Sequence, residues 1–324
     1  MKKKVLILGG AGFIGLGIAR FIGENRDYDI TIADIFSPGQ KDSDFNQVAA
    51  DYSIKIIEGD FTDPEMFFKL DSSYDYVYML ASVVGVNRCI EEPHEVIRIN
   101  TALIQNSLKW IIENNIGKVL FSSSSECYAA TTETFNYPVP TPEQVPLTID
   151  KISHPRFTYA VTKILGESAF LNYGTHYNFP VTIVRYQNIF GPRMGFKHVI
   201  PHLVERFYNN ENPFKIYGAN QTRAFCYITD AAEGTVLAME NENSDHEIYH
   251  MGSPEEITIE ELVKIVGDLM GYSGEYVSAP TYPGSVSRRC PDITKSKEHL
   301  NYSPKVPWKE GLKETVSWYT DFYS

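Results

Sequence analysis

Short runs of apolar residues alternate with amphipathic segments through the first half of the chain. The apolar runs predict strands at 5–8, 30–33, 54–57, 76–80, 119–122 and 181–185. The amphipathic segments between them predict helices at 13–25, 64–70, 94–114 and 158–177. Strands that alternate with helices form a parallel sheet whose two faces are both covered. The pattern therefore predicts an α/β fold with a doubly wound parallel sheet.

The pattern changes after about residue 186, where Gly, Pro and aromatic residues separate shorter elements. Longer helices are predicted there at 259–270 and 308–322. We expect residues 186–324 to form mainly a smaller lobe, with some segments returning to the sheet domain at 1–185. A ligand cleft is expected where this lobe covers the carboxyl ends of the strands.

Three glycines follow the first predicted strand and open the first predicted helix, in the spacing Gly9-x-x-Gly12-x-x-Gly15. The first glycine permits a tight turn, the second lets backbone amides approach a pyrophosphate, and the third lets the helix pack closely on the strand. A glycine triplet alone could be only a tight turn. Its position between a strand and a helix is what a dinucleotide site requires, because the helix N-terminus attracts phosphate.

The second predicted strand is followed by Asp34, which is placed to accept hydrogen bonds from the adenosine ribose. A carboxylate at this position would repel a 2′-phosphate, so NAD is predicted in preference to NADP. Asp60 ends the third strand and is a candidate adenine contact. The complete set of predicted cofactor-binding residues is Gly9, Gly12, Phe13, Ile14, Gly15, Asp34, Asp60, Phe61, Leu80, Ala81 and Lys163.

A tyrosine and a lysine lie four residues apart on the helix predicted at 158–177, so Tyr159 and Lys163 share one helical face. A lysine beside a tyrosine stabilises the phenolate and is expected to lower the pKa of the tyrosine. The tyrosine could then take a proton from a sugar hydroxyl while hydride leaves the same carbon. Such a pair is common by chance. Here it follows a dinucleotide motif and a strand ending in the serine run 122–125, whose hydroxyls could orient the proton transfer.

Composition narrows the range of partners. The net charge of −12 disfavours nucleic acid, because phosphate backbones bind basic surfaces. No run approaches the roughly 20 apolar residues of a membrane helix, so no membrane segment is expected. The four cysteines are far apart and include no C-x-x-C pair, so neither a metal site nor a disulfide is expected and a cytoplasmic location is predicted. They are Cys89, Cys127, Cys226 and Cys290.

Taken together, these motifs resemble the extended short-chain dehydrogenase/reductase family over nearly the whole chain. The matching residues are Gly9, Gly12, Gly15, Asp34, Asp60, Leu80, Ala81, Ser122–Ser125, Tyr128, Tyr159, Lys163, Asn188, Gly191, Pro192, Arg223 and Asp230. The resemblance implies a Rossmann domain, a tightly held NAD, and a smaller C-terminal lobe that binds a nucleotide-diphosphate sugar. It also implies a homodimer built from the helices at 94–114 and 158–177.

By the same resemblance, Ser124 would be the catalytic hydroxyl, Tyr159 the base and Lys163 its partner. Asn188 would lie in the substrate site and Arg223 on the diphosphate. The predicted catalytic residues are Ser124, Tyr159, Lys163 and Glu126, and the predicted substrate-binding residues are Ser125, Asn188, Arg193, Arg223 and Arg289.

Members of the family share oxidation of the sugar at carbon 4 and differ in the later chemical steps. Ser124-Ser125-Glu126-x-Tyr128 resembles the Thr-Ser-Glu-x-Tyr segment of UDP-glucuronate decarboxylases, and Pro155-Arg156-Phe157-x-Tyr159 is similar to a Pro-Arg-Trp-x-Tyr segment of a bacterial one. Arg289-Cys-Pro-Asp-Ile resembles a segment in which the arginine aids proton delivery. A decarboxylase is therefore predicted, with a 4-epimerase or a carbon-4 dehydrogenase that releases the keto sugar as alternatives.

Several departures from the family pattern leave undetermined which sugar and which nucleotide base the substrate pockets bind. Ser124 replaces a threonine, Cys127 and Ala129 replace Val and Gly around the tyrosine, and Thr162 replaces a serine. Glu126 could be a base, a hydroxyl ligand or a structural acid, and Arg289 could equally be solvated or bind the diphosphate. Ser125 stands where 4,6-dehydratases carry aspartate, which disfavours dehydration.

Two other classes compete with this interpretation. A non-catalytic NAD-binding regulator would be expected to lack the tyrosine or the lysine, and this chain has Ser124, Tyr159 and Lys163 together. A dehydrogenase acting on free sugars or alcohols is disfavoured by the long second lobe with its arginines, which suit a diphosphate.

Overall fold

A seven-stranded parallel sheet forms the centre of the computed structural model, which describes residues 2–37, 39–281 and 285–324. The strand order is β11-β6-β5-β4-β1-β2-β3, and every neighbouring pair is parallel. The strands are β1 (Lys3–Leu8), β2 (Tyr28–Asp34), β3 (Lys55–Glu58), β4 (Ser73–Met79), β5 (Asn115–Ser124), β6 (Val181–Tyr186) and β11 (Glu247–Met251). This order confirms the predicted α/β, Rossmann-type doubly wound fold.

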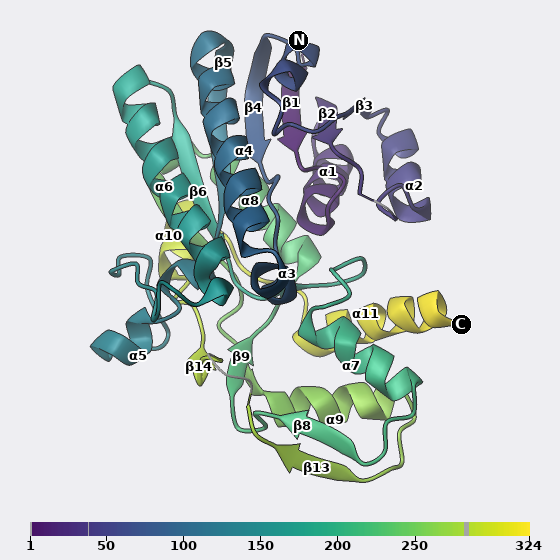
Figure 1. Cartoon of the computed structure of the whole chain (residues 1–324). Coiled ribbons are helices and arrows are strands. Elements are labelled where there is room, and N and C mark those ends of the chain that lie inside the picture. Colours follow the sequence, from purple (N-terminus) through teal and green to yellow (C-terminus); the bar gives the residue numbers. More distant parts are fainter. Residues whose placement is uncertain (1, 38, 282–284) are drawn as a thin grey trace.

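Helices cover both faces of the sheet (Figure 1). On one face α1 (Phe13–Asn25) packs against α8 (Ile228–Glu240), and on the other α4 (Pro93–Glu113) packs against α6 (Thr158–Tyr177). Alternate side chains of β1 therefore enter different cores, Val5 and Ile7 on the α1 side and Leu6 and Leu8 on the α4 side. Burial on both faces explains why this strand is a continuous apolar run.

The second lobe lies beyond the carboxyl ends of the strands, below the sheet in Figure 1. Its core is formed largely by α7 (Val199–Tyr208), β8 (Phe214–Tyr217), α9 (Ile259–Leu269), β13 (Tyr276–Ala279) and α11 (Trp308–Tyr323). Helix α9 begins with a capping box, in which the Thr258 hydroxyl accepts from the Glu261 amide and the Glu261 carboxylate accepts from the Thr258 amide.

Short elements connect these layers or line the region between them. The helical ones are α2 (Ser43–Asp51), η1 (Pro64–Lys69), α3 (Val86–Glu91), η2 (Ser125–Tyr128), α5 (Thr131–Phe135), η3 (Pro155–Phe157), η4 (Glu242–Ser244) and α10 (Thr294–Leu300). The remaining strands are β7 (Ile189–Phe190), β9 (Thr222–Ala224), β10 (Cys226–Tyr227), β12 (Glu256–Thr258) and β14 (Arg288–Arg289).

The observed helices and strands differ in two main ways from those predicted from the sequence. The helix predicted at 64–70 is the shorter 3-10 helix η1. Strand β11 and helix α8, both from the second half of the chain, were not predicted, although they complete the sheet and cover one face of it. Strand β11 carries the fully buried His250 among its apolar residues, so it does not stand out as an apolar run. The predicted boundary at residue 185, between the sheet domain and the second lobe, stays a prediction.

No helix in the described part of the chain combines the length and the apolar character needed to cross a bilayer. All four cysteines are buried and free.

Candidate active site

The glycine loop between β1 and α1 has a geometry that only glycine satisfies. Gly9 has a φ of +86°, and a Cβ atom there would lie 2.5 Å from the backbone nitrogen of Ala81. A Cβ atom on Gly15 would lie 2.5 Å from the carbonyl oxygen of Gly9. The loop is thus held close both to the end of β4 and to the first turn of α1.

The start of α1 is suited to a negatively charged group. No described side chain caps this helix, and its first turn contains no acidic residue. A Cβ atom on Gly12 would meet only the Gly9 carbonyl, at 3.4 Å, so the N-terminal turn is uncrowded. Because unpaired amides and the helix dipole attract phosphate, the loop fits the pyrophosphate of NAD.

Asp34, at the end of β2, is buried beside this loop. Its carboxylate accepts hydrogen bonds from the amides of Ala11 at 2.9 Å and Phe36 at 3.2 Å. Burial raises the pKa of Asp34, and the amides of Ala11, Phe36 and Ile35 oppose that rise. A carboxylate fixed next to the glycine loop is where the ribose of a dinucleotide would be recognised.

The other predicted cofactor contacts lie at the same edge of the sheet. The amides of Leu80 and Ala81 both donate to the Leu8 carbonyl, at 2.9 and 2.8 Å, which sets the end of β4 beside the loop. Asp60 is exposed and accepts from the amide and hydroxyl of Thr62. The ring of Phe61 is buried in the core against Phe67. Phe13 and Ile14 begin α1 and pack against the second-lobe core.

Three of the four predicted catalytic residues meet where β5 ends and α6 begins. Ser124 is the last residue of β5, and its hydroxyl is hydrogen-bonded to the Tyr159 side chain in the first turn of α6. The Lys163 ammonium group donates to the Ser122 carbonyl at 2.8 Å and lies 5.6 Å from the centroid of the Tyr159 ring. The structure therefore brings Ser124, Tyr159 and Lys163 together.

Burial dominates the ionisation of this pair. It raises the pKa of Tyr159, the charges of Cys127 and Glu126 add to that rise, and the hydrogen bond to Ser124 opposes it. Burial also lowers the pKa of Lys163 to about 8. The sequence led us to expect a lowered pKa for Tyr159. The difference arises because the cost of removing the phenolate from water exceeds the stabilisation that the surroundings supply.

Next to these groups, Glu126 is surrounded by arginines. Its carboxylate accepts from the Arg289 guanidinium at 2.5 Å. Burial raises the pKa of Glu126, but the positive charges of Arg289, Arg156 and Arg223 outweigh it and hold the pKa below its usual value. Glu126 is therefore ionised at neutral pH, in a positively charged surrounding.

The predicted substrate-binding residues do not all gather at this point. Arg223 and Arg289 are register partners on β9 and β14, beside Glu126. Asn188 has a φ of +40°, and its amide donates to the Ala224 carbonyl at 3.0 Å, while Ser125 is buried at the start of η2. Arg193, in contrast, forms an ion pair with Asp42 at 2.6 Å in the segment after β2.

A buried ion pair behind the site was not predicted. Glu167 forms two hydrogen bonds with Arg185, at 2.8 and 2.7 Å, and accepts from the Ser123 hydroxyl at 2.5 Å. Its side chain and that of Arg185 are 4% and 2% exposed. The signal that could have found it is spacing, since Glu167 follows Lys163 by one helical turn on the same face of α6.

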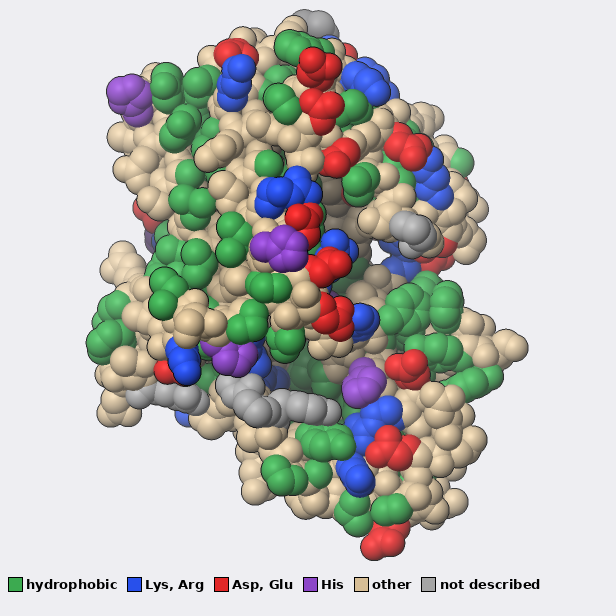
Figure 2. All heavy atoms as spheres, in the orientation of Figure 1, with side chains coloured by type: hydrophobic (Ala, Val, Ile, Leu, Met, Phe, Trp, Pro, Cys, Tyr) green, Lys and Arg blue, Asp and Glu red, His purple; other side chains and the backbone are tan. Residues whose placement is uncertain are grey.

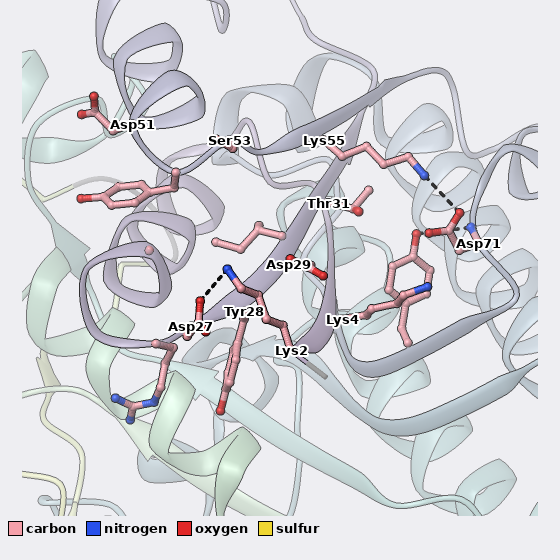
Figure 3. Close-up of a pocket in the computed structure, with 15 residues that line it drawn as sticks. Lys2, Lys4, Asp27, Tyr28, Asp29, Thr31, Asp51, Ser53, Lys55 and Asp71 are labelled. Carbon is pink, nitrogen blue, oxygen red and sulfur yellow. Dashed lines mark hydrogen bonds and ion pairs between the residues drawn. The ribbon is translucent and has the colours of Figure 1, made fainter.

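The surface is hollowed between the sheet domain and the second lobe, where charged and histidine side chains gather (Figure 2). A second hollow, of about 510 Å³, lies at the opposite end of the sheet from the glycine loop, by the amino ends of β1, β2 and β3 (Figure 3). There Lys2 pairs with Asp27 at 2.6 Å and Lys55 with Asp71 at 3.0 Å. Because these charges neutralise each other, we assign no ligand to the second hollow.

Comparisons with known proteins identify the family of this chain. The model of the NAD dependent epimerase/dehydratase family matches residues 5–252. A UDP-N-acetyl-alpha-D-glucosaminuronate decarboxylase from Bacillus cytotoxicus is 34% identical over 331 residues, covering 99% of this chain and 99% of that protein. A putative UDP-glucose 4-epimerase from Methanocaldococcus jannaschii is 30% identical, with 97% of both chains covered.

A solved structure shares the whole fold. The UDP-glucose 4-epimerase of Thermotoga maritima, crystallised with UDP-glucose, is 29% identical with a TM-score of 0.85, covering 99% of this chain and 100% of that one. The chain belongs to the NAD-dependent epimerase/dehydratase family of extended short-chain dehydrogenase/reductases, enzymes that use NAD to modify nucleotide sugars.

Proposed function

We propose that this enzyme decarboxylates a UDP-linked hexuronate, beginning with oxidation at carbon 4 of the sugar. The observation that carries the proposal is the Glu126–Arg289 ion pair beside Ser124 and Tyr159. Because Arg156 and Arg223 also surround the Glu126 carboxylate, the site keeps positive charge that suits the negative charge developing on the sugar during loss of CO2. The decarboxylase from B. cytotoxicus, 34% identical over 99% of both chains, supports the same reaction class.

The first step uses the groups at the end of β5. Tyr159 takes the proton of the carbon-4 hydroxyl, and the Ser124 hydroxyl orients that oxygen. The positive charge of Lys163, 5.6 Å from the centroid of the tyrosine ring, partly offsets the burial that disfavours the phenolate, and it is the deprotonated Tyr159 that acts as the base. NAD, when bound along the glycine loop, would accept the hydride that leaves carbon 4. The product of this step is a 4-keto sugar.

The second step depends on the chemistry of that product. A carboxylate on carbon 5 is now a β-keto acid, so the bond between carbons 5 and 6 can break and release CO2. The electron pair of that bond moves to the carbon-4 oxygen, which becomes an enolate, and carbon 5 is later protonated. Arg289, held in place by Glu126, stabilises the enolate electrostatically.

The test is a proton NMR time course of the protein with NAD and either UDP-glucuronate or UDP-N-acetylglucosaminuronate. We expect the carboxylated sugar to be converted to a pentose or 4-keto-pentose with release of CO2. Glu126→Gln, which removes the charge that anchors Arg289, should slow the conversion about 100-fold. Full turnover by Glu126→Gln would contradict the role given to this residue.

A 4-epimerase is the second candidate, because the M. jannaschii relative and the T. maritima structure are both named as UDP-glucose 4-epimerases. The same time course separates the two. Inversion at carbon 4, with the carboxylate retained or with UDP-glucose as substrate, would replace the decarboxylase proposal.

We also infer that two copies of the chain associate through α4 and α6. These neighbouring helices expose large apolar side chains, namely Ile97, Ile112, Val161, Leu165, Tyr173 and Tyr177. Exposed apolar patches of this kind favour protein contacts. Sedimentation velocity should give the mass of a dimer, and Leu165→Glu should shift it toward the monomer. A monomeric wild-type protein would contradict the inference.

A cytoplasmic location, consistent with four free cysteines, stays a prediction.

A further inference from the structure

Arg156 lies directly before the catalytic helix but has no role in the two reaction steps proposed for this enzyme. It belongs to η3, which runs into α6, and Tyr159 follows three residues later. The backbone amide of Arg156 donates to the His154 ring at 3.2 Å, which fixes the entry into the helix. The local structure therefore holds Arg156 next to the residue that removes the sugar proton.

The side chain of Arg156 has an unused hydrogen-bond donor. Its Nε atom is buried and finds no acceptor among the described residues. Buried guanidinium donors are nearly always paired, since leaving one unpaired costs free energy. An acceptor from outside the protein, placed at the sugar end of the site, would satisfy it.

The charges around Glu126 show what kind of acceptor fits. Three guanidinium groups, those of Arg289, Arg156 and Arg223, act on this single carboxylate, so positive charge is in excess. Arg223 and Arg289 are neighbours on the strands of the second lobe. Arg156 comes instead from the sheet domain, beside Tyr159. A nucleotide-linked neutral sugar brings only the diphosphate charge, whereas a hexuronate brings a carboxylate at the sugar as well.

We infer that Arg156 binds the carboxylate of the sugar and thereby makes the site select hexuronates over neutral hexoses. This inference rests on the hexuronate substrate of the proposed function. A planar guanidinium can form paired hydrogen bonds to a carboxylate, which gives both affinity and orientation. Because the carboxylate loses its charge as CO2 leaves, Arg156 stabilises the bound substrate at least as much as the transition state, so its removal should raise KM without lowering kcat.

The experiment compares two ligands that differ at one carbon, UDP-glucuronate and UDP-glucose, by isothermal titration of the protein loaded with NADH, which cannot accept a hydride and so prevents turnover. Arg156→Gln should weaken the binding of UDP-glucuronate roughly 10- to 100-fold and leave that of UDP-glucose within about 3-fold. Arg156→Lys, which keeps the charge, should restore part of the selectivity. Arg20→Gln, at an exposed arginine of α1, is the matched control and should change neither affinity.

Two results would overturn the inference. One is an equal loss of affinity for both ligands, which would indicate a structural role or a diphosphate contact. The other is unchanged binding of UDP-glucuronate, or a wild-type protein that does not prefer it. Failure of the proposed function is seen separately, as absence of CO2 release by a wild-type protein whose preference for UDP-glucuronate still depends on Arg156.

Discussion

Tyr159→Phe is expected to lower kcat about 10²- to 10⁴-fold, the range that general acid–base groups usually contribute. The variant loses the one oxygen that can take the proton of the carbon-4 hydroxyl, while the ring keeps its place beside Lys163. The Ser124 hydroxyl also loses one of its partners, although it still accepts from the Glu126 amide, so two groups of the site are affected together. Turnover is measured by NMR on the nucleotide sugar that the wild-type protein converts, at saturating NAD.

The control for this variant is Tyr208→Phe, at an exposed tyrosine of α7 in the second lobe, which should keep the wild-type rate. The bound NAD content of both variants should match that of the wild-type protein. A Tyr159→Phe rate within a few-fold of wild type would exclude the assigned base. Another group would then have to act as the base, whereas a non-catalytic NAD-binding regulator on the same fold would be favoured only by a wild-type protein that converts no nucleotide sugar.

Glu167→Ala is expected to lower the free energy of unfolding by about 3–5 kcal/mol, because it leaves the Arg185 guanidinium buried without its counter-charge. The change also removes the acceptor of the Ser123 hydroxyl, one residue before Ser124. Helix α6 would thus lose its ion pair with β6 and one of its polar attachments to β5, while the Lys163–Ser122 hydrogen bond remains. Urea unfolding followed by circular dichroism measures the effect.

Two further variants make this prediction specific. Replacing both partners, Glu167→Met with Arg185→Met, should cost less than Glu167→Ala alone, since no buried charge is left unpaired. Glu95→Gln, which breaks the exposed pair with Arg98 on α4, should leave stability unchanged within error. If Glu167→Ala and Glu95→Gln have the same effect, the buried pair does not stabilise the fold as argued.

Features that depend on local spacing were predictable from the sequence. The turn at Gly9, the close packing at Gly15, and the shared face of Tyr159 and Lys163 are all set within a few residues. The strands of the first half were recognisable because burial on both faces makes them apolar. Strand β11 was missed because its His250 interrupts the apolar pattern, and its place beside β6 is fixed by long-range pairing.

In the candidate site, too, contacts between distant segments could not be predicted from the sequence. The pairing of Arg289 with Glu126 and the register of Arg289 beside Arg223 join segments far apart in the chain, so no spacing rule reveals them. Arg193 was grouped with these arginines by residue type alone, and its ion pair with Asp42 depends on how the second lobe meets the segment after β2. The direction of the Tyr159 pKa depends on burial, which a motif does not report.

The position of β11 at the edge of the sheet also affects how the chain is made. On the ribosome, β6 emerges well before α8, which packs beside α1 on one face of the sheet, and before β11, which pairs with the free edge of β6. Until Met251 has left the exit tunnel, the nascent sheet exposes an unpaired strand and an uncovered apolar face, the kind of surface that chaperones bind and that drives aggregation. Slow translation between β6 and β11 would prolong this vulnerable stage, whereas a pause after β11 would not.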